Sequence, residues 1–195
     1  MKIQAIIFDF FGVIYDDPIA PLLASMSPHK IAAIKVICQK LDLGQIDYKQ
    51  YVDHIALTLE VPSNELRNCF EKTQPRREVI ALLRKISAQI PLALLSNAAS
   101  EEVRPRLQSC GIAPLFKEVL ISAEIGRAKP DPEIFLLCCK RLGLAPQSCL
   151  FIDDRSANVI AAKQLGMQTM LFKNSPGLQS KISKYCPSLM LDFDQ

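Results

Sequence analysis

The feature that most constrains this chain is a short apolar run near its start that ends in an aspartate. Residues 3–8 read IQAIIF, Asp9 follows directly, and Gly12 comes three residues later. Such a run, rich in β-branched residues, is typical of a strand buried on both faces of a parallel sheet. A carboxylate at the end of that strand is costly to bury unpaired, and open α/β sheets bind ligands beyond these strand ends. Asp9 is therefore either a functional residue or an aspartate that caps the following turn.

The chain after residue 75 alternates between helical and strand-like patterns. Strand patterns fall at residues 91–96, 119–122, 149–153 and 168–172, with a further short one at 189–193. Amphipathic helical patterns fall at residues 79–86, 101–109, 132–142 and 156–165. Helices between successive strands imply parallel strands joined by right-handed crossovers. The sequence therefore predicts an α/β fold built on a doubly wound parallel sheet.

Residues 16–74 differ from their flanks because they show helical periodicity and no strand-like run. Apolar side chains recur at helical spacing over residues 31–41, 48–59 and 63–72. A Ser27-Pro28 pair before the first of these stretches suits a helix N-cap and first turn. We expect three or four helices inserted between the first and second strands. The expected division is a core of residues 1–15 and 75–195 and a helical insert of residues 16–74.

Composition and charge argue against several classes of function. The net charge is only +3 and no run of Lys or Arg is present, so a nucleic-acid partner is not expected. No apolar stretch has transmembrane length and the start shows no signal-peptide pattern, which predicts a cytoplasmic protein without a membrane partner. Seven cysteines without a CxxC pair and only two histidines argue against zinc. No pattern indicates the oligomeric state.

Polar motifs recur where predicted strands end, and their order is informative. The set comprises Asp9, Ser96-Asn97, Lys129 in GRAKPDPEIF, and Asp153-Asp154 followed by Asn158. Together they resemble the haloacid dehalogenase superfamily of phosphatases and related hydrolases, over residues 3 to about 172. The segment FIDDRSANVIAAKQLGM is similar to the phosphatase-like branch of that superfamily. The resemblance implies a Rossmann-like core with a helical cap, inserted after the first strand, that closes over the strand ends and selects the substrate.

The resemblance also implies a role for each motif. Asp9 would be the nucleophile, Lys129 would assist it, and Ser96, Asn97 and Lys129 would hold a phosphoryl group. Mg²⁺ would be bound directly by Asp9, the Phe11 carbonyl and Asp154, through water by Asp153, and with Asn158 in the outer shell. A carboxylate can attack phosphorus only when the charge that it meets is neutralised, which is what Mg²⁺ provides. Each motif has a simpler alternative: Asp153-Asp154 as a helix cap, Ser96-Asn97 as a turn, and Lys129 as a solvated lysine.

Phe11 departs from the usual pattern, which has an aspartate two residues after the nucleophile. That aspartate protonates the leaving oxygen, and such general acid–base assistance is worth about 10²–10⁴-fold. Three readings stay open. The first is a Mg²⁺-dependent phosphatase that acts on a small phosphorylated metabolite, such as a sugar phosphate, through an aspartyl-phosphate at Asp9. The second is a 2-haloacid dehalogenase, and the third is a non-catalytic binding or regulatory protein. The acidic pair Asp153-Asp154 argues against the dehalogenase, and Asp9 with Lys129 argues against a degenerate site.

Substrate selection is expected to depend on the insert. Its candidate polar and aromatic side chains are Tyr15, Asp17, His29, Tyr48, Tyr51 and His54.

Overall fold

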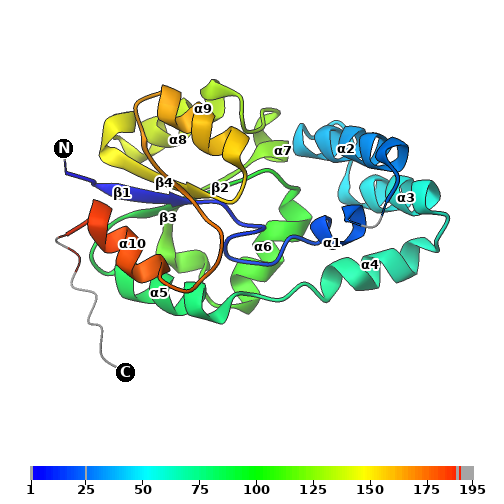
Figure 1. Cartoon of the computed structure of the whole chain (residues 1–195), viewed down its shortest axis with the longest axis horizontal. Helices are drawn as coiled ribbons and strands as arrows, with labels where there is room; N and C mark the ends of the chain where they lie inside the picture. Colours follow the sequence, from blue (N-terminus) through cyan, green and yellow to red (C-terminus); the bar gives the residue numbers. More distant parts are fainter. Residues whose placement is uncertain (1, 25, 188, 190–195) are drawn as a thin grey trace.

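A five-stranded parallel sheet forms the centre of the molecule in the computed structural model, which describes residues 2–24, 26–187 and 189 (Figure 1). The strands are β1 (Ala5–Phe8), β2 (Leu92–Ser96), β3 (Phe116–Ile121), β4 (Cys149–Asp153) and β5 (Gln168–Leu171). Their order is β3-β2-β1-β4-β5, and every neighbouring pair is parallel. β1 therefore lies in the middle, between β2 and β4. The predicted doubly wound parallel sheet is confirmed.

Helices cover both faces of the sheet, as the alternation of the sequence predicts. One layer contains α5 (Arg77–Ser87), α6 (Ser100–Ser109) and α10 (Leu178–Tyr185), and the other contains α8 (Pro132–Leu142) and α9 (Ser156–Gln164). Side chains of β1 alternate between the two layers because successive strand residues face opposite ways. Ile6 and Phe8 pack in the cluster with α5, α6 and α10, whereas Ala5 and Ile7 pack with α8 and α9. β1 is buried on both faces, as its apolar sequence requires.

Short helical turns complete the core. They are α7 (Ser122–Ile125) and the 3₁₀ turns η1 (Ala113–Leu115) and η2 (Pro146–Ser148).

Four helices follow β1 and lie together beyond the ends of the strands (Figure 1). They are α1 (Ala20–Leu23), α2 (Pro28–Asp42), α3 (Tyr48–Leu59) and α4 (Ser63–Glu71), and we call them the cap. Ser27 accepts a hydrogen bond from the Lys30 backbone to cap α2, and Asp47 with Gln50 forms a capping box at α3. The cap has its own hydrophobic cluster, which includes Ile34, Val52 and Phe70. The predicted helical insert after the first strand is confirmed.

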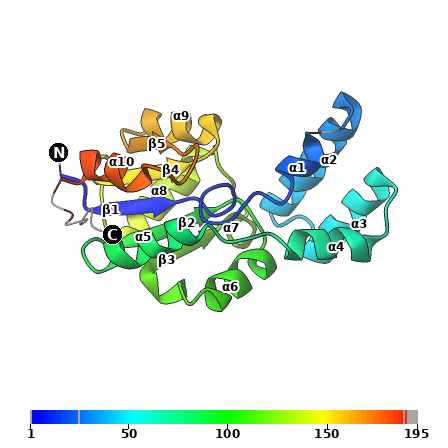
Figure 2. The ribbon, with the colours of Figure 1, turned by 60° about the horizontal axis from the view of Figure 1, so that its bottom comes forward.

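The two connections between the core and the cap run side by side (Figure 2). Tyr15 and Pro75 form an antiparallel bridge, flanked by backbone hydrogen bonds from Asp16 to Gln74 (3.1 Å) and from Arg76 to Ile14 (2.8 Å). The chain therefore leaves the core and returns to it at the same place. The exact division at residues 15/16 and 74/75 stays a prediction.

One strand starts earlier than the sequence predicts, and another predicted strand lies outside the described residues. β3 begins at Phe116 rather than at residue 119, because this edge strand exposes Lys117 and so lacks a continuous apolar run. The predicted strand at 189–193 lies outside the described residues, apart from Leu189. Within the described ranges, no helix combines the length and apolar character needed to cross a membrane.

Candidate active site

The carboxyl ends of the three central strands bring the predicted motifs together. Asp9 follows β1, Ser96 ends β2 and Asp153 ends β4, and β1 pairs with both of the other strands. The Asp9 backbone N–H donates to the Ile152 carbonyl at 2.9 Å, which extends the pairing of β1 with β4 to Asp9, the predicted nucleophile. Residues far apart in the sequence therefore meet because parallel strands end at one edge of the sheet.

Lys129 is the centre of this cluster. Its Nζ donates to Asp9 Oδ1 (2.7 Å), to Asp153 Oδ2 (2.7 Å) and to the Leu95 carbonyl (2.8 Å). The side chain is only 1% exposed. Burial alone would lower the pKa of Lys129, but the carboxylates of Asp153 and Asp9 outweigh it and raise that pKa. The ammonium is thus a fixed positive charge beside the predicted nucleophile, not a solvated lysine.

Asn97 holds the backbone on which Lys129 is carried. Its Nδ2 donates to the Lys129 carbonyl at 2.8 Å, and its Oδ1 accepts from the Lys129 N–H at 2.8 Å. The side-chain amide of Asn97 is thereby committed to positioning Lys129. Ser96 differs, because its buried Oγ has no hydrogen-bond partner in the part of the chain that the structure describes. An unpaired buried hydroxyl at a strand end is suited to donate to an oxyanion.

Three carboxyl groups crowd around the single ammonium. Oxygens of Asp9, Asp153 and Asp154 lie within 4.8 Å of one another. Burial raises the pKa of Asp9 to about 7, and Asp153 and Asp154 act in the same direction while Lys129 opposes them. The pKa of Asp154 is also raised, first by burial and then by Asp153. The excess of negative charge favours an additional cation at this place.

The hydrogen bonds distinguish Asp153 from Asp154. Asp153 accepts from Lys129, from the Arg155 backbone (2.8 Å) and from Asn158 Nδ2 (3.0 and 3.1 Å). Asp154 Oδ1 is buried and has no hydrogen-bond partner among the described residues. A carboxylate oxygen left unpaired in this way is costly unless a cation meets it. These residues therefore fit Mg²⁺, which prefers carboxylate oxygens.

Gly12 is required where the loop after β1 passes Asp154. Its φ is +85°, which favours glycine, and a Cβ there would lie 2.4 Å from Asp154 Oδ2. The glycine that marks the end of the first apolar run thus allows this close approach.

Phe11 places an apolar ring where the family pattern has a carboxylate. The ring packs edge-on against Phe10, with centroids 4.9 Å apart, and the Arg106 guanidinium lies 5.6 Å from its centroid. Phe11 also lines the cavity between core and cap. No proton donor is therefore available from its side chain.

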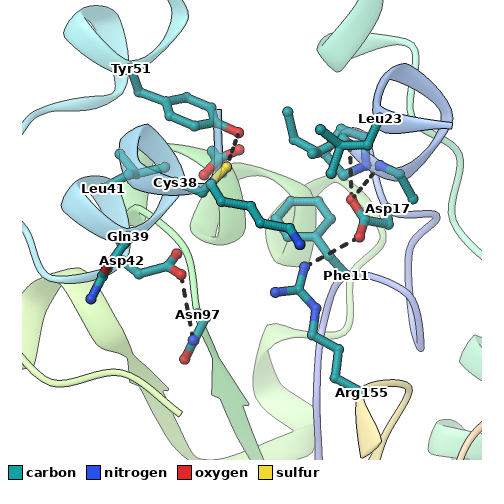
Figure 3. Close-up of a pocket in the computed structure, with 15 residues that line it drawn as sticks. Phe11, Asp17, Leu23, Cys38, Gln39, Leu41, Asp42, Tyr51, Asn97 and Arg155 are labelled. Carbon is teal, nitrogen blue, oxygen red and sulfur yellow. Dashed lines mark hydrogen bonds and ion pairs between the residues drawn. The ribbon is translucent and has the colours of Figure 1, made fainter. Parts of the chain in front are cut away.

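A cavity of about 460 Å³ lies between the core and the cap (Figure 3). This volume is within the usual range for small-molecule sites. Two polar contacts join the two parts across it: Arg155 Nη2 to Asp17 Oδ2 at 3.4 Å, and Asn97 Nδ2 to Asp42 Oδ2 at 3.5 Å. Arg155 belongs to the loop after β4 and Asp42 ends α2. The cavity therefore adjoins the predicted phosphate site through Asn97.

The cavity contains carboxyl groups that the sequence analysis did not single out. Burial raises the pKa of Glu102, on α6, to about 7, and burial raises the pKa of Asp42 to about 6. Neither residue follows a strand, so the signal that identified Asp9 does not apply to them. The available signal for Asp42 is its place at the carboxyl end of a helix, where a negative charge is unfavourable. For Arg155 the sequence offers one signal, its position directly after Asp154.

The cap candidates divide into two groups. Asp17 and Tyr51 line the cavity. Tyr48 instead stacks on Tyr51, with ring centroids 6.0 Å apart, and His29 and His54 are exposed outside the lining. Tyr15, also outside the lining, is buried in the core.

Comparisons with known proteins agree on one family. A family model described as haloacid dehalogenase-like hydrolase matches residues 3–166. Human N-acylneuraminate-9-phosphatase is 26% identical over 115 residues, which are 58% of this chain and 46% of that protein. The chain thus spans less than half the length of that relative. (S)-2-haloacid dehalogenase 2 of Pseudomonas sp. (strain CBS-3) is 24% identical over 191 residues, covering 86% of this chain and 82% of that one.

A solved structure has the same fold. It is the HAD family enzyme BT-2542 from Bacteroides thetaiotaomicron, in complex with magnesium and inorganic phosphate. The TM-score is 0.69 at 22% identity, and the match covers 88% of this chain and 95% of that one.

Proposed function

Because this chain belongs to the haloacid dehalogenase-like hydrolase family, we propose that it is a Mg²⁺-dependent phosphatase of small phosphorylated metabolites, such as a sugar phosphate. The observation that carries the proposal is the acidic cluster around Lys129, in which Asp154 Oδ1 is buried and unpaired among the described residues. A dehalogenase, in which the nucleophile displaces halide, has no evident use for such a metal-binding pair. The magnesium and phosphate in the similar BT-2542 structure support the same choice.

The geometry suggests a role for each residue. Both the Phe10 N–H and Lys129 Nζ donate to Asp9 Oδ1, each at 2.7 Å, which leaves Oδ2 to attack phosphorus. Ser96 Oγ and Lys129 would hold phosphoryl oxygens, and Asn97 would keep Lys129 in place. Asp9 would form an aspartyl-phosphate, which water then hydrolyses to regenerate the carboxylate.

Mg²⁺ would supply the positive charge that lets the Asp9 carboxylate approach an anionic phosphoryl group. Asp9, Asp154 and the Phe11 carbonyl would bind it directly, with Asp153 acting through water. Asn158, which donates to both oxygens of Asp153, would hold that residue from outside.

A panel of phosphorylated metabolites and 2-haloacids, assayed with Mg²⁺ and with EDTA, tests this function. We expect phosphate release that EDTA abolishes and that the Asp9→Asn variant lacks, while the thermal midpoint of that variant stays equal or rises because repulsion is relieved. Metal-independent halide release would favour the dehalogenase instead, which the 24% identity over most of a haloacid dehalogenase keeps as the second candidate. No turnover on a broad panel would favour a binding protein.

A further inference from the structure

A phosphatase of this kind needs a proton donor that Phe11 does not provide. Three other carboxyl groups line the cavity, namely Asp17, Asp42 and Glu102. Asp17 is occupied on both oxygens, since Oδ1 accepts from the Ile19 and Ala20 backbones and Oδ2 pairs with Arg155. Glu102 accepts from the Ala99 backbone at 3.3 Å and so stabilises the start of α6. Two of the three carboxyl groups therefore already have a structural role.

Asp42 has no comparable structural role. It forms no ion pair within the described residues. Its carboxylate lies at the carboxyl end of α2, where the helix dipole disfavours negative charge. Its hydrogen bond, from Asn97 Nδ2 at 3.5 Å, is long. A half-buried acid that stabilises neither its helix nor an ion pair is a candidate for chemistry.

A short chain of contacts connects Asp42 to the reacting groups. Asn97 contacts Asp42 with the same Nδ2 that donates to the Lys129 carbonyl. Lys129 in turn contacts Asp9. Asp42 thus reaches the predicted phosphate site from the cap through Asn97. The labelled side chains in Figure 3 show Asp42 and Asn97 pointing toward each other across this boundary.

We propose that Asp42 is the catalytic acid and base that replaces the aspartate missing at Phe11, an inference that rests on the proposed phosphatase function. As the bond from phosphorus to the leaving oxygen breaks and the bond to Asp9 forms, the Asp42 carboxylic acid gives its proton to that oxygen. The Asp42 carboxylate then takes a proton from the water that attacks the aspartyl-phosphate. The products are an alcohol and phosphate, and both aspartates return to their starting forms.

The surroundings of Asp42 suit a group that alternates between acid and carboxylate. Burial raises its pKa to about 6, Asp17 adds to this, and Arg155, Lys129 and the Asn97 hydrogen bond oppose it. The other titratable groups that interact with it are Glu102 on α6, Tyr51 on α3 and Cys38 on its own helix. A catalytic acid works best when its pKa lies near the working pH.

Leaving-group selectivity tests this assignment. p-Nitrophenyl phosphate needs little protonation, whereas an alkyl phosphate leaves as a poor alkoxide. We expect Asp42→Asn to lower kcat/KM, which reports the first step alone, by about 10²–10⁴-fold on an alkyl phosphate and to change kcat/KM on the aryl substrate far less. Asp42→Glu should recover part of the alkyl activity. In the wild type, kcat/KM on the alkyl substrate should fall as pH rises through the pKa of the acid in the free enzyme, a limb that the aryl substrate lacks.

Two variants make the test specific. Asp53→Asn is the matched control, because Asp53 lies on α3 in a surface pair with Lys49 at 2.9 Å and should leave both rates unchanged. Glu102→Gln should also leave the ratio of alkyl to aryl rates unchanged. An alkyl-selective loss in Glu102→Gln instead would assign the acid to Glu102 and overturn the proposal.

The remaining outcomes separate this proposal from the function on which it rests. An equal loss of kcat/KM on both substrates in Asp42→Asn would show that Asp42 only positions Asn97, and unchanged rates on both substrates would reject Asp42 altogether. A wild type that is inactive on both phosphates would reject the phosphatase function itself. The pH profiles of the wild type and of Glu102→Gln test the assignment even where Asp42→Asn folds poorly, because an alkyl-specific limb that disappears in Glu102→Gln would belong to Glu102.

Discussion

At the scale of single residues, Lys129 is the side chain on which the site most depends. It is buried between Asp9 and Asp153, each at 2.7 Å. A buried ion pair gives little net stability when complete, but removing one partner leaves the other charge uncompensated. Here two carboxylates share the one ammonium, so its loss would leave both carboxylates buried without a compensating positive charge.

We therefore expect Lys129→Met to lower the free energy of unfolding by about 3–5 kcal/mol in the absence of metal, in addition to abolishing activity. Urea denaturation in EDTA measures this. The matched control is Lys49→Met, which removes an exposed pair with Asp53 and should cost no more than about 1 kcal/mol. Equal midpoints for the two variants would mean that the cluster is not held by Lys129.

The site could be predicted from the sequence only in part. Asp9, Ser96 and Asp153 are recognisable because an apolar strand ends at each, and parallel strands end together. Asp42 and Glu102 lie on helices, where a carboxylate is ordinary, and their position depends on how the cap sits over the core. No local pattern encodes that packing.

At the scale of elements, α6 begins with a buried acid. Glu102 is only 4% exposed, accepts from the Ala99 backbone and lines the cavity. Burial raises its pKa from 4.5 to about 7, although the Ala99 bond and Arg106 oppose this. The folded protein therefore binds a proton at Glu102 that the unfolded chain releases at lower pH.

This linkage gives α6 a pH-dependent stability. Because the folded pKa is raised, the contribution of Glu102 is present below about pH 4.5 and is lost as pH rises toward about 7. Glu102→Gln keeps an oxygen acceptor for Ala99 and removes the ionisation. We expect the variant to match the wild type at pH 4 and to exceed it above pH 7, by roughly 3 kcal/mol at most. Urea midpoints at several pH values measure the difference, and parallel curves would contradict it.

At the scale of the whole molecule, three hydrophobic clusters organise the chain. Two lie on the faces of the sheet and the third lies within the cap. The alternating strands and helices of the core were predictable because each pattern is local. The start of β3 was not, because an edge strand need not be apolar throughout.

The cap cluster is smaller than the core cluster that contains Ile6 and Phe8. A smaller hydrophobic cluster, joined to the rest of the protein by two chain connections, should open more easily. We expect native-state hydrogen exchange to show lower protection for α2 and α3 than for β1 and β4. The change between high and low protection should fall near residues 15 and 75. Uniform protection across both parts would show that cap and core form one cooperative unit.

The adjacent connections at Tyr15 and Pro75 have a consequence for how specificity and chemistry are divided. Because the cap starts and finishes at one point, its length and sequence can vary without altering the register of β1 with β2. Joining two nearby ends also costs little more when the loop between them grows, since the entropy of closure depends only logarithmically on length. The cap is in this sense an exchangeable module: the core retains the predicted nucleophile, the lysine and the predicted metal ligands, and we expect substrate range to depend on what is inserted between them.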